Sequence, residues 1–479
     1  MRRDLDALAS REHDLLVVGG GIYGAAAAWD GAQRGLTVAL VEREDFGAGV
    51  SSNSLKTIHG GLRYLQKADL ARMRESIRER RALMRIAPAI VRPLPFLVPT
   101  YGHGVAGREA LTVALALNDL ISHDRNHGLP VSHHIPRGRI LSRHDVLGRL
   151  PGVLARGLNG GGLWTDAQVG SSERLGVAFV HAAAEAGAAV ANHVEALGFL
   201  KVAGRVTGIR ARDTATGGDL EVRARVVLNA AGPGVDALLA EGGIRRPPAP
   251  LLKAWNLVFA RPPSAPLAVG TRTEGRFLFL VPWRDRTMVG TAYAPAETPS
   301  DQAVTAFRDE AVRAFPWARL EDAPLALVHE GLVPGHGGPS GLSTRPRLHD
   351  HESEDGVAGL VSVQGVKYTT ARAVAEKAID LVLRRLGRPG APCQTAVTPL
   401  PRARPLDGPL EARTVEAVRE EMAVTLSDAV LRRLDLGTAG RPLAADLETV
   451  ARTMARHLGW DAAREGAERA ALAKRFPPA

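Results

Sequence analysis

The stretch DLLVVGGGIYGAAAAWDGAQRGLTVALVE, residues 14–42, decides the fold of this chain of 479 residues. A short apolar run predicts a buried strand that enters Gly19-x-Gly21-x-x-Gly24. An alanine-rich segment then predicts a helix that ends at Gly35, and a second apolar run ends in Glu42. Strand, glycine turn, helix and strand in this order are typical of a βαβ unit that binds a dinucleotide.

Each of these residues has a physical task in such a unit. Gly19 permits the tight turn, Gly21 lets the backbone approach a pyrophosphate, and Gly24 brings the helix close to the strand. The helix N-terminus offers unpaired N–H groups and a partial positive charge to the phosphates. Glu42 accepts hydrogen bonds from a ribose hydroxyl and disfavours a 2′-phosphate, so NADP is not expected.

The next segment points to a flavin rather than to NAD. Residues 45–65, DFGAGVSSNSLKTIHGGLRYL, are rich in hydroxyl, amide and glycine residues and lack apolar periodicity, which predicts a loop with many polar contacts. Ser51 and Ser52 can donate to a pyrophosphate or a ring edge, and Gly60 and Gly61 let the chain pass close to a flat ring. The alternative is an ordinary surface loop.

Two later segments have the same character. Residues 222–232, VRARVVLNAAG, predict a strand that runs into Ala230, Ala231 and Gly232, whose small side chains let the backbone lie against a dinucleotide. Residues 365–370, GVKYTT, precede a predicted helix, and N–H groups at a helix start can stabilise an electron-rich carbonyl.

Four motifs carry a resemblance to a known family: GGGIYG at 19–24, SSNSLKTIHGGLRYL at 51–65, VVLNAAGPGVD at 226–236 and SVQGVKYTTARAVAEKA at 362–378. In order and spacing the chain resembles the FAD-dependent glycerol-3-phosphate dehydrogenases, within the D-amino-acid-oxidase-like flavoproteins. The resemblance implies FAD as cofactor and oxidation of a secondary alcohol, such as glycerol 3-phosphate to dihydroxyacetone phosphate, by hydride transfer to flavin N5. The cofactor contacts it implies are Gly19, Gly21, Ile22, Gly24, Glu42, Ser51, Ser52, His59, Gly60, Gly61, Val194, Ala231, Gly232, Gly365, Lys367 and Thr369.

The expected fold is α/β: a Rossmann-like FAD-binding domain with an inserted mixed or antiparallel substrate-binding sheet and a C-terminal helical cap. The FAD-binding domain is expected at 11–100, 165–244 and 336–395, the substrate-binding domain at 101–164 and 245–335, and the helical cap at 410–479. The apolar runs FLFLVPW (277–283) and TMVGTAY (287–293) predict strands that roof the flavin.

Composition limits the compartment and the partners. The one cysteine, Cys393, excludes an intrachain disulfide, and no apolar leader or long apolar run is present, so we expect a cytoplasmic protein. The net charge is +10, yet the arginines are dispersed and aromatic residues make up only 4%, so nucleic acid is not expected as a partner. No metal site and no covalent flavin are expected.

Residues 68–88 predict an amphipathic helix with a basic face, either packed in the core or lying on a membrane surface. We favour the core. The family resemblance still implies a quinone or another electron acceptor, and peripheral contact with the inner face of a membrane.

The substrate half of the resemblance is altered. Arg63, Arg345 and Lys367 match positions that the family uses near an anionic substrate. The family's Lys-Gly-Ser-His, whose histidine is the candidate base, is Lys-Ala-Trp-Asn here, ending in Asn256. The family's Gly-Val-Arg-Pro, whose arginine binds phosphate, is Gly-Leu-Val-Pro, with Val333 in place of the arginine.

A replacement base is therefore needed. His329 is the first candidate, with His336 and His59 behind it, because a histidine can titrate near neutrality. The alternatives to glycerol 3-phosphate oxidation are a flavin oxidoreductase of the same fold that acts on another polyol, a hydroxy acid or an amine, and a flavin-binding protein without turnover.

Overall fold

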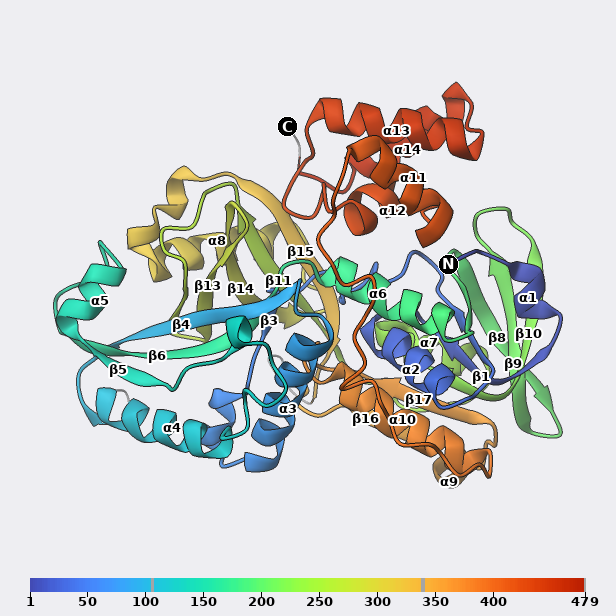
Figure 1. The fold of residues 1–479 in the computed structure, drawn as a ribbon, viewed down its shortest axis with the longest axis horizontal. Helices are drawn as coiled ribbons and strands as arrows, with labels where there is room; N and C mark the ends of the chain where they lie inside the picture. Colours follow the sequence, from blue (N-terminus) through green and yellow to red (C-terminus); the bar gives the residue numbers. More distant parts are fainter. Residues whose placement is uncertain (105–106, 337–340, 478–479) are drawn as a thin grey trace.

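The computed structural model describes residues 1–104, 107–336 and 341–477. The chain forms two sheets side by side, with a group of C-terminal helices above their junction (Figure 1). This arrangement confirms the α/β fold, with a second mixed sheet and a helical C-terminal region, that the sequence predicts.

The first sheet contains the predicted βαβ unit. It has eight strands in the order β16-β17-β10-β1-β2-β7, with β8 and β9 joined to β10. Its strands are β1 (Glu12–Val18), β2 (Val38–Val41), β7 (Ala189–Ala191), β8 (Val194–Val202), β9 (Arg205–Asp213), β10 (Asp219–Asn229), β16 (Arg347–Asp350) and β17 (Leu360–Gln364). Because β1, β10 and β17 are parallel and in register at Val18, Asn229 and Ser362, the loops that follow them meet at one edge.

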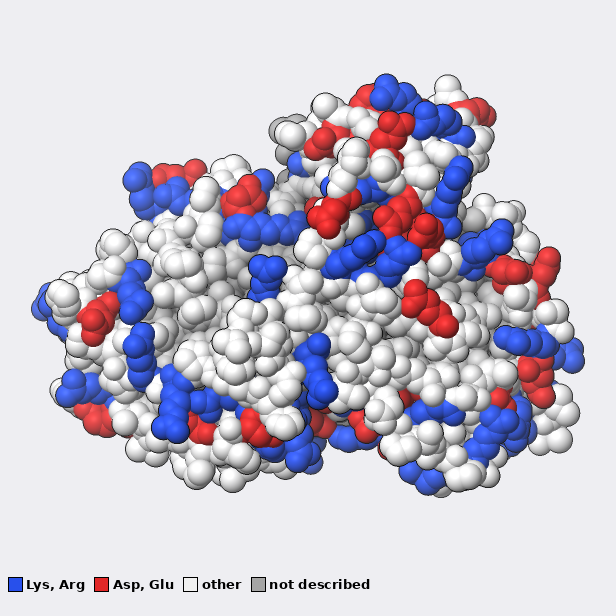
Figure 2. Space-filling view, in the orientation of Figure 1, with Lys and Arg blue, Asp and Glu red and all other residues white. Residues whose placement is uncertain are grey.

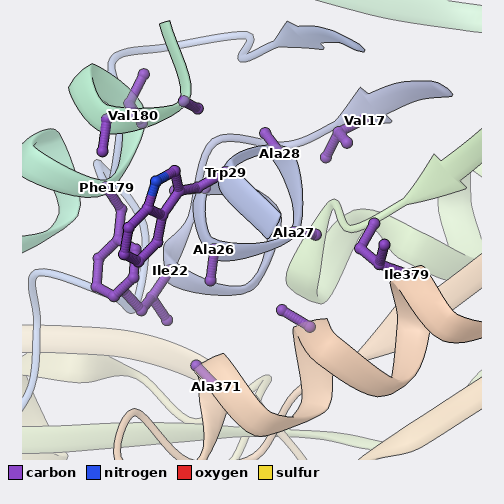
Figure 3. Packing of buried hydrophobic residues seen from close by; sticks show 14 of the residues in the cluster. Val17, Ile22, Ala26, Ala27, Ala28, Trp29, Phe179, Val180, Ala371 and Ile379 are labelled. Carbon is purple, nitrogen blue, oxygen red and sulfur yellow. The ribbon is translucent and has the colours of Figure 1, made fainter. Parts of the chain in front are cut away.

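Close packing of helices holds this edge in place. The helices of this half are α1 (Leu5–Ala9), α2 (Ile22–Gln33), α6 (Ser172–Glu185), α7 (Val235–Glu241), α9 (His351–Asp355) and α10 (Ala371–Arg385). Figure 3 shows the small side chains Ala26, Ala27 and Ala28 of α2 between its neighbours, with Trp29 against Phe179 of α6. Those two rings meet edge to face, with centroids 5.4 Å apart. The alanines let α2 approach the sheet and α10 closely, which fixes the helix N-terminus above β1.

The second sheet has nine strands in the order β15-β11-β14-β13-β12-β4-β6-β3, with β5 paired to β6. Its strands are β3 (Thr57–Ile58), β4 (Val91–Tyr101), β5 (Arg139–Ser142), β6 (Leu158–Val169), β11 (Leu251–Phe259), β12 (Ala268–Arg272), β13 (Phe277–Trp283), β14 (Arg286–Pro295), β15 (Leu325–Pro334). The expected domain boundaries at 100 and 165 need correction, because β4 and the end of β6 belong to this sheet. They pair along their length from Val91 with Val169 to Tyr101 with Leu158, a contact between distant segments that no local pattern announces.

The helices beside the second sheet include the amphipathic segment. They are α3 (Leu70–Ile86), α4 (Arg108–Ile121), α5 (Arg143–Arg149) and α8 (Ser300–Ala314). Met73, Ile77 and Met84 of α3 are buried, so the core interpretation of this helix is right, although Leu70 is 51% exposed. Lys and Arg are interspersed with acidic residues over the face in Figure 2. Within the described residues, no helix combines the length and the apolar character needed to cross a membrane.

The C-terminal helices are α11 (Leu410–Glu421), α12 (Leu426–Asp428), α13 (Ala444–Leu458) and α14 (Ala462–Ala473). Thr425 and Asp428 form a capping box at the start of α12. A buried ion cluster joins this region to the first sheet: the carboxylate of Asp45 accepts from Arg432, from Arg433 at 2.6 and 2.7 Å, and from Asn192 at 2.9 Å. Burial alone would raise the pKa of Asp45, but the two arginine charges lower it.

Candidate cofactor and substrate site

The three glycines of the motif differ in what surrounds them. Gly19 has φ +106°, and a Cβ there would lie 2.5 Å from the carbonyl oxygen of Ala230. A Cβ on Gly24 would overlap the carbonyl oxygen of Gly19. A Cβ on Gly21 would meet only Ser51 Oγ, at 3.2 Å. The protein's own packing therefore explains the first and third glycines, and the space at Gly21 fits a pyrophosphate.

The two serines of the loop have different partners. Ser51 Oγ accepts a hydrogen bond of 3.0 Å from the backbone N–H of Ile22, so its hydroxyl lies at the N-terminus of α2. Ser52 Oγ donates to the carbonyl of Gly47 at 2.6 Å. Ser51 is therefore placed beside the predicted pyrophosphate position, whereas the hydroxyl of Ser52 holds the loop together.

Lys56 is a structural centre of this loop that the sequence analysis missed. Its Nζ is buried and donates to the carbonyl of Ser52 at 2.7 Å, to Ser172 Oγ at 2.7 Å and to Glu173 Oε1 at 2.6 Å. Burial lowers the pKa of Lys56, although Glu173 opposes the shift. The pair fastens the loop to the start of α6. The sequence indicated a role for Lys56 only through its position inside the motif at 51–65.

Glu42 lies where a ribose-binding acid is expected. Its carboxylate accepts from the backbone N–H groups of Gly20 at 2.7 Å and Glu44 at 3.0 Å, and its backbone carbonyl accepts from Val194 N at 2.8 Å. Burial raises the pKa of Glu42. The structure thus brings Glu42 and Val194, 152 positions apart in sequence, to the same end of β2.

Tyr23 fixes the segment that follows β17. Its hydroxyl accepts from the N–H groups of Val366 and Lys367, both at 3.1 Å, and donates to the carbonyl of Lys367 at 2.7 Å. A Cβ on Gly365 would overlap the Tyr23 ring. Burial raises the pKa of Tyr23 to about 12, so it stays a neutral donor. Position 365 must therefore be glycine to leave room for the Tyr23 ring. Thr369, four residues later in the same segment, is buried.

The turn after β10 closes the same edge. Ala231 lies against Gly19, and Gly232 has φ +58°, a conformation that favours glycine.

The His59 segment is organised around buried Asp166. Asp166 accepts from Gly60 N at 2.7 Å, faces His59 Nδ1 at 3.2 Å and pairs with Arg80. Burial alone would raise the pKa of Asp166, but Arg80 and the bonds from His59 and Gly60 lower it to about 2. A Cβ on Gly60 would meet Arg80 and Asp166, so packing within the protein already requires glycine at this position. Gly61, at φ +85°, faces the ring of Tyr64.

A group of cations surrounds Tyr64. Lys367 Nζ donates to Tyr64 Oη, and burial and the charge of exposed Arg63 lower the pKa of Lys367 to about 8. The guanidinium of Arg72 lies 5.0 Å from the centre of the Tyr64 ring. Arg345, with 77% of its side chain exposed, lies 3.9 Å from Asp69, which also pairs with Arg72.

The surroundings of His329 do not favour the role of base that the sequence predicts for it. Both ring nitrogens face backbone carbonyls, Ser54 O at 3.3 Å and Thr438 O at 3.1 Å, in a fully buried position. Burial and the charge of Lys56 lower the pKa of His329 to about 4. His329 therefore does not titrate near neutrality and joins three parts of the chain instead. His336 is exposed, at the end of a described segment.

The two altered positions are also on this sheet. Asn256 of β11 pairs directly with His329 of β15, accepts from Thr291 Oγ1 at 2.7 Å and donates to Asn53 O at 3.4 Å. Val333 pairs with Leu252 and brings no charge. Asn256 thus ties the second sheet to the loop at 45–65.

Comparison with known proteins agrees with this geometry. Residues 14–381 match the model of the FAD dependent oxidoreductase family, and residues 391–465 match that of the C-terminal domain of alpha-glycerophosphate oxidase. The fold resembles that of a glycerol-3-phosphate dehydrogenase from Bacillus halodurans complexed with FAD, with a TM-score of 0.72 and 22% identity over 98% of this chain and 95% of that one.

Relatives by sequence extend over most of the chain. The glycerol-3-phosphate dehydrogenase of Synechocystis sp. is 32% identical over 84% of this chain and 75% of its own length. The aerobic enzyme of Staphylococcus haemolyticus is 30% identical over 82% and 72%, and the mitochondrial enzyme of Homo sapiens is 31% identical over 80% and 54%. The chain thus spans about half the length of the mitochondrial relative. It belongs to the FAD-dependent oxidoreductase family, with glycerol-3-phosphate dehydrogenases as its relatives along most of its length.

Proposed function

We propose that this oxidoreductase oxidises a secondary alcohol that carries an anionic group, with glycerol 3-phosphate to dihydroxyacetone phosphate as the first candidate reaction. The observation that carries the proposal is a pair of basic residues at Tyr64, Arg63 for the charge of the substrate and Lys367 for its hydroxyl proton, beside the segment that Tyr23 fixes. The names of the relatives support the choice of substrate.

The residues that would hold FAD follow from the site. The open space at Gly21, with the N-terminus of α2 and Ser51, suits the pyrophosphate, and Glu42 suits the adenosine ribose. The backbone of the segment 365–370 would lie beside the ring system. When bound, FAD supplies the acceptor for the hydride of the alcohol. The protein's part is to orient the alcohol, bind its charge and remove the hydroxyl proton.

Arg63 is proposed as the anion ligand. It is exposed, and its planar fork matches two phosphate oxygens. Arg345 has 77% of its side chain exposed and pairs with Asp69, so its contribution is proposed as secondary.

Lys367 is proposed as the base in place of His329. A pKa of about 8 leaves a useful fraction of neutral amine near neutral pH, and the contact with Tyr64 Oη offers a path for the proton. Asn256, at the altered position, holds the loop and has no basic nitrogen.

The deciding experiment is anaerobic bleaching of the yellow holoprotein. Glycerol 3-phosphate should bleach it, and glycerol, which lacks the charge, should bleach it far more slowly. Bleaching by another polyol, a hydroxy acid or an amine, with none by glycerol 3-phosphate, would replace the substrate, an outcome that Asn256 and Val333 make worth testing. No bleaching by any member of the panel would favour a flavin-binding protein without turnover.

We also propose a peripheral membrane contact, with a quinone as acceptor. Its support is α4, where Val113, Leu117 and Leu120 are 60%, 43% and 70% exposed along one helix face. Flotation with anionic liposomes tests it: the protein should float, and Leu120→Asp should reduce flotation. Equal flotation of both would exclude α4 as the contact. The cytoplasmic location stays a prediction.

A further inference from the structure

A second cluster of reactive side chains lies at the outer edge of the first sheet, on α9 and its neighbouring strands (Figure 1). It comes from the sequence HDHESED, residues 349–355. His349 is in β16, and His351 and Asp355 are the first and last residues of α9. No step of the proposed reaction uses them.

The two imidazoles converge on one carboxylate oxygen. His349 Nε2 lies 2.8 Å and His351 Nδ1 lies 2.6 Å from Asp355 Oδ2. The ring centroids are 4.4 Å apart and the planes are inclined by 72°. Both histidines are buried, at 6% and 0% exposed, whereas the carboxylate side opens to solvent. Two nitrogens and one oxygen thus meet at a point that water can reach.

The other nitrogen of each ring has a hydrogen-bonding partner on the side away from Asp355. His349 Nδ1 lies 2.7 Å from Glu354 Oε2, and His351 Nε2 lies 2.8 Å from Ser362 Oγ of β17. This is the arrangement that orients metal-binding histidines: an outer acceptor fixes the tautomer and leaves the inner lone pair free to coordinate.

His349 faces a carboxylate on both sides, Glu354 and Asp355. A neutral imidazole has one N–H, so it can satisfy one of them and must turn a lone pair toward the other. A cation held between the ring and Asp355 would use that lone pair and would leave the N–H for Glu354.

We propose that His349, His351 and Asp355 bind a divalent transition metal ion, with Zn²⁺ as the best match to two imidazoles and one carboxylate, and with water completing the coordination. Tetrahedral bonds of about 2.1 Å place ligand atoms roughly 3.4 Å apart, so Asp355 must withdraw slightly from both rings. Its position at the exposed end of α9, just before Gly356 at φ +70°, permits this movement.

One charge opposes the ion. Arg246 Nη1 lies 3.7 Å from Asp355 Oδ2 and must turn aside when the metal binds. Arg385, by contrast, is already paired with Asp350 and Glu352. The bound metal would join β16 to β17 through His351 and Ser362, three residues before Gly365. Its role would be structural, supporting the strand that leads into the segment at 365–370.

The experiment uses the full-length holoprotein after EDTA treatment and dialysis, titrated calorimetrically with ZnCl₂ and heated with and without the metal. One equivalent of Zn²⁺ per chain should bind and raise the melting temperature. His349→Gln and Asp355→Asn should each weaken binding by about 100-fold or more, and Glu354→Gln, which removes only the outer acceptor, by about 10–100-fold. Flavin absorbance verifies that each variant is folded.

His144→Gln is the matched control, because His144 is exposed on α5, outside the cluster. It should leave the zinc affinity unchanged. The absence of saturable binding to the parent protein would overturn the proposal, and so would equal affinities in the parent and the Glu354→Gln and Asp355→Asn variants. None of these outcomes depends on the substrate proposed above.

Discussion

Gly21→Ala and Gly24→Ala should separate cofactor binding from folding. At Gly24 a methyl group would overlap the carbonyl oxygen of Gly19, so α2 must move away from β1 even without FAD. Overpacking of this kind costs about 1–3 kcal/mol or more. At Gly21 the nearest atom is Ser51 Oγ at 3.2 Å, so the flavin-free protein should lose no more than the roughly 1 kcal/mol of a poorer helix N-cap.

For FAD affinity the order of the two variants reverses, and Gly21→Ala should have the larger effect. The methyl group on residue 21 takes the space that fits the pyrophosphate, and a clash worth about 1–3 kcal/mol weakens FAD binding by about 5- to 150-fold. The assays are thermal unfolding of the deflavinated variants and titration of each with FAD, followed by quenching of flavin fluorescence. A Gly21→Ala variant with the parent's FAD affinity, or one as destabilised without FAD as Gly24→Ala, would refute the reasoning.

Four further predictions follow from the site and the domain contacts. If Lys367 is the base, kcat/KM should rise with pH up to a pKa of about 8 and then level off, because the neutral amine is the active form. Lys367→Arg should lower the rate by about 10²–10⁴ and abolish this rise with pH. A rise that is unaltered in the variant would exclude Lys367 as the base. Arg63→Lys should raise KM for glycerol 3-phosphate but not for glycerol, and an equal rise for both would leave Arg63 a structural role. The pKa of His329 is lowered to about 4 in the folded protein, whereas the unfolded chain accepts the proton below about pH 6.5, so the free energy of unfolding should fall by up to about 3 kcal/mol between pH 6.5 and 4. Urea unfolding of His329→Gln should lack this pH-dependent loss of stability. If the variant instead loses much of the rate and keeps the parent's pH dependence of stability, His329 is restored as base. Asp45→Asn leaves two buried arginines without their carboxylate and should cost about 3–5 kcal/mol, whereas exposed Asp219→Asn should cost little; similar urea midpoints for the two variants would show that the buried cluster is not needed.

Local patterns were sufficient for individual elements of the fold. The βαβ unit and the strands at 277–283 and 287–293 follow from spacing within a few residues, and the structure has all of them. Pairing between distant segments was not predictable. For example, β4 pairs with β6 in the second sheet, and nothing in the sequence of β4 indicates this pairing instead of a place in the first sheet.

The site shows the same division. Motif positions located the loops, but the partners of individual side chains depend on the tertiary structure. Tyr23 stands inside the quoted glycine motif, yet its role depends on a segment more than 340 residues later. His329 was chosen as base from its position alone, whereas a histidine's titration depends on burial and on neighbouring charge, which no spacing reveals.

The Asp45 cluster has an evolutionary consequence. Residues 45, 432 and 433 form one electrostatic unit although Asp45 lies 387 positions before Arg432 in the sequence. The C-terminal helices therefore cannot be exchanged between homologues as an independent module, since a chimera that receives the arginines without the acid, or the acid without the arginines, carries an uncompensated buried charge. Among homologues, these three positions should change together or not at all.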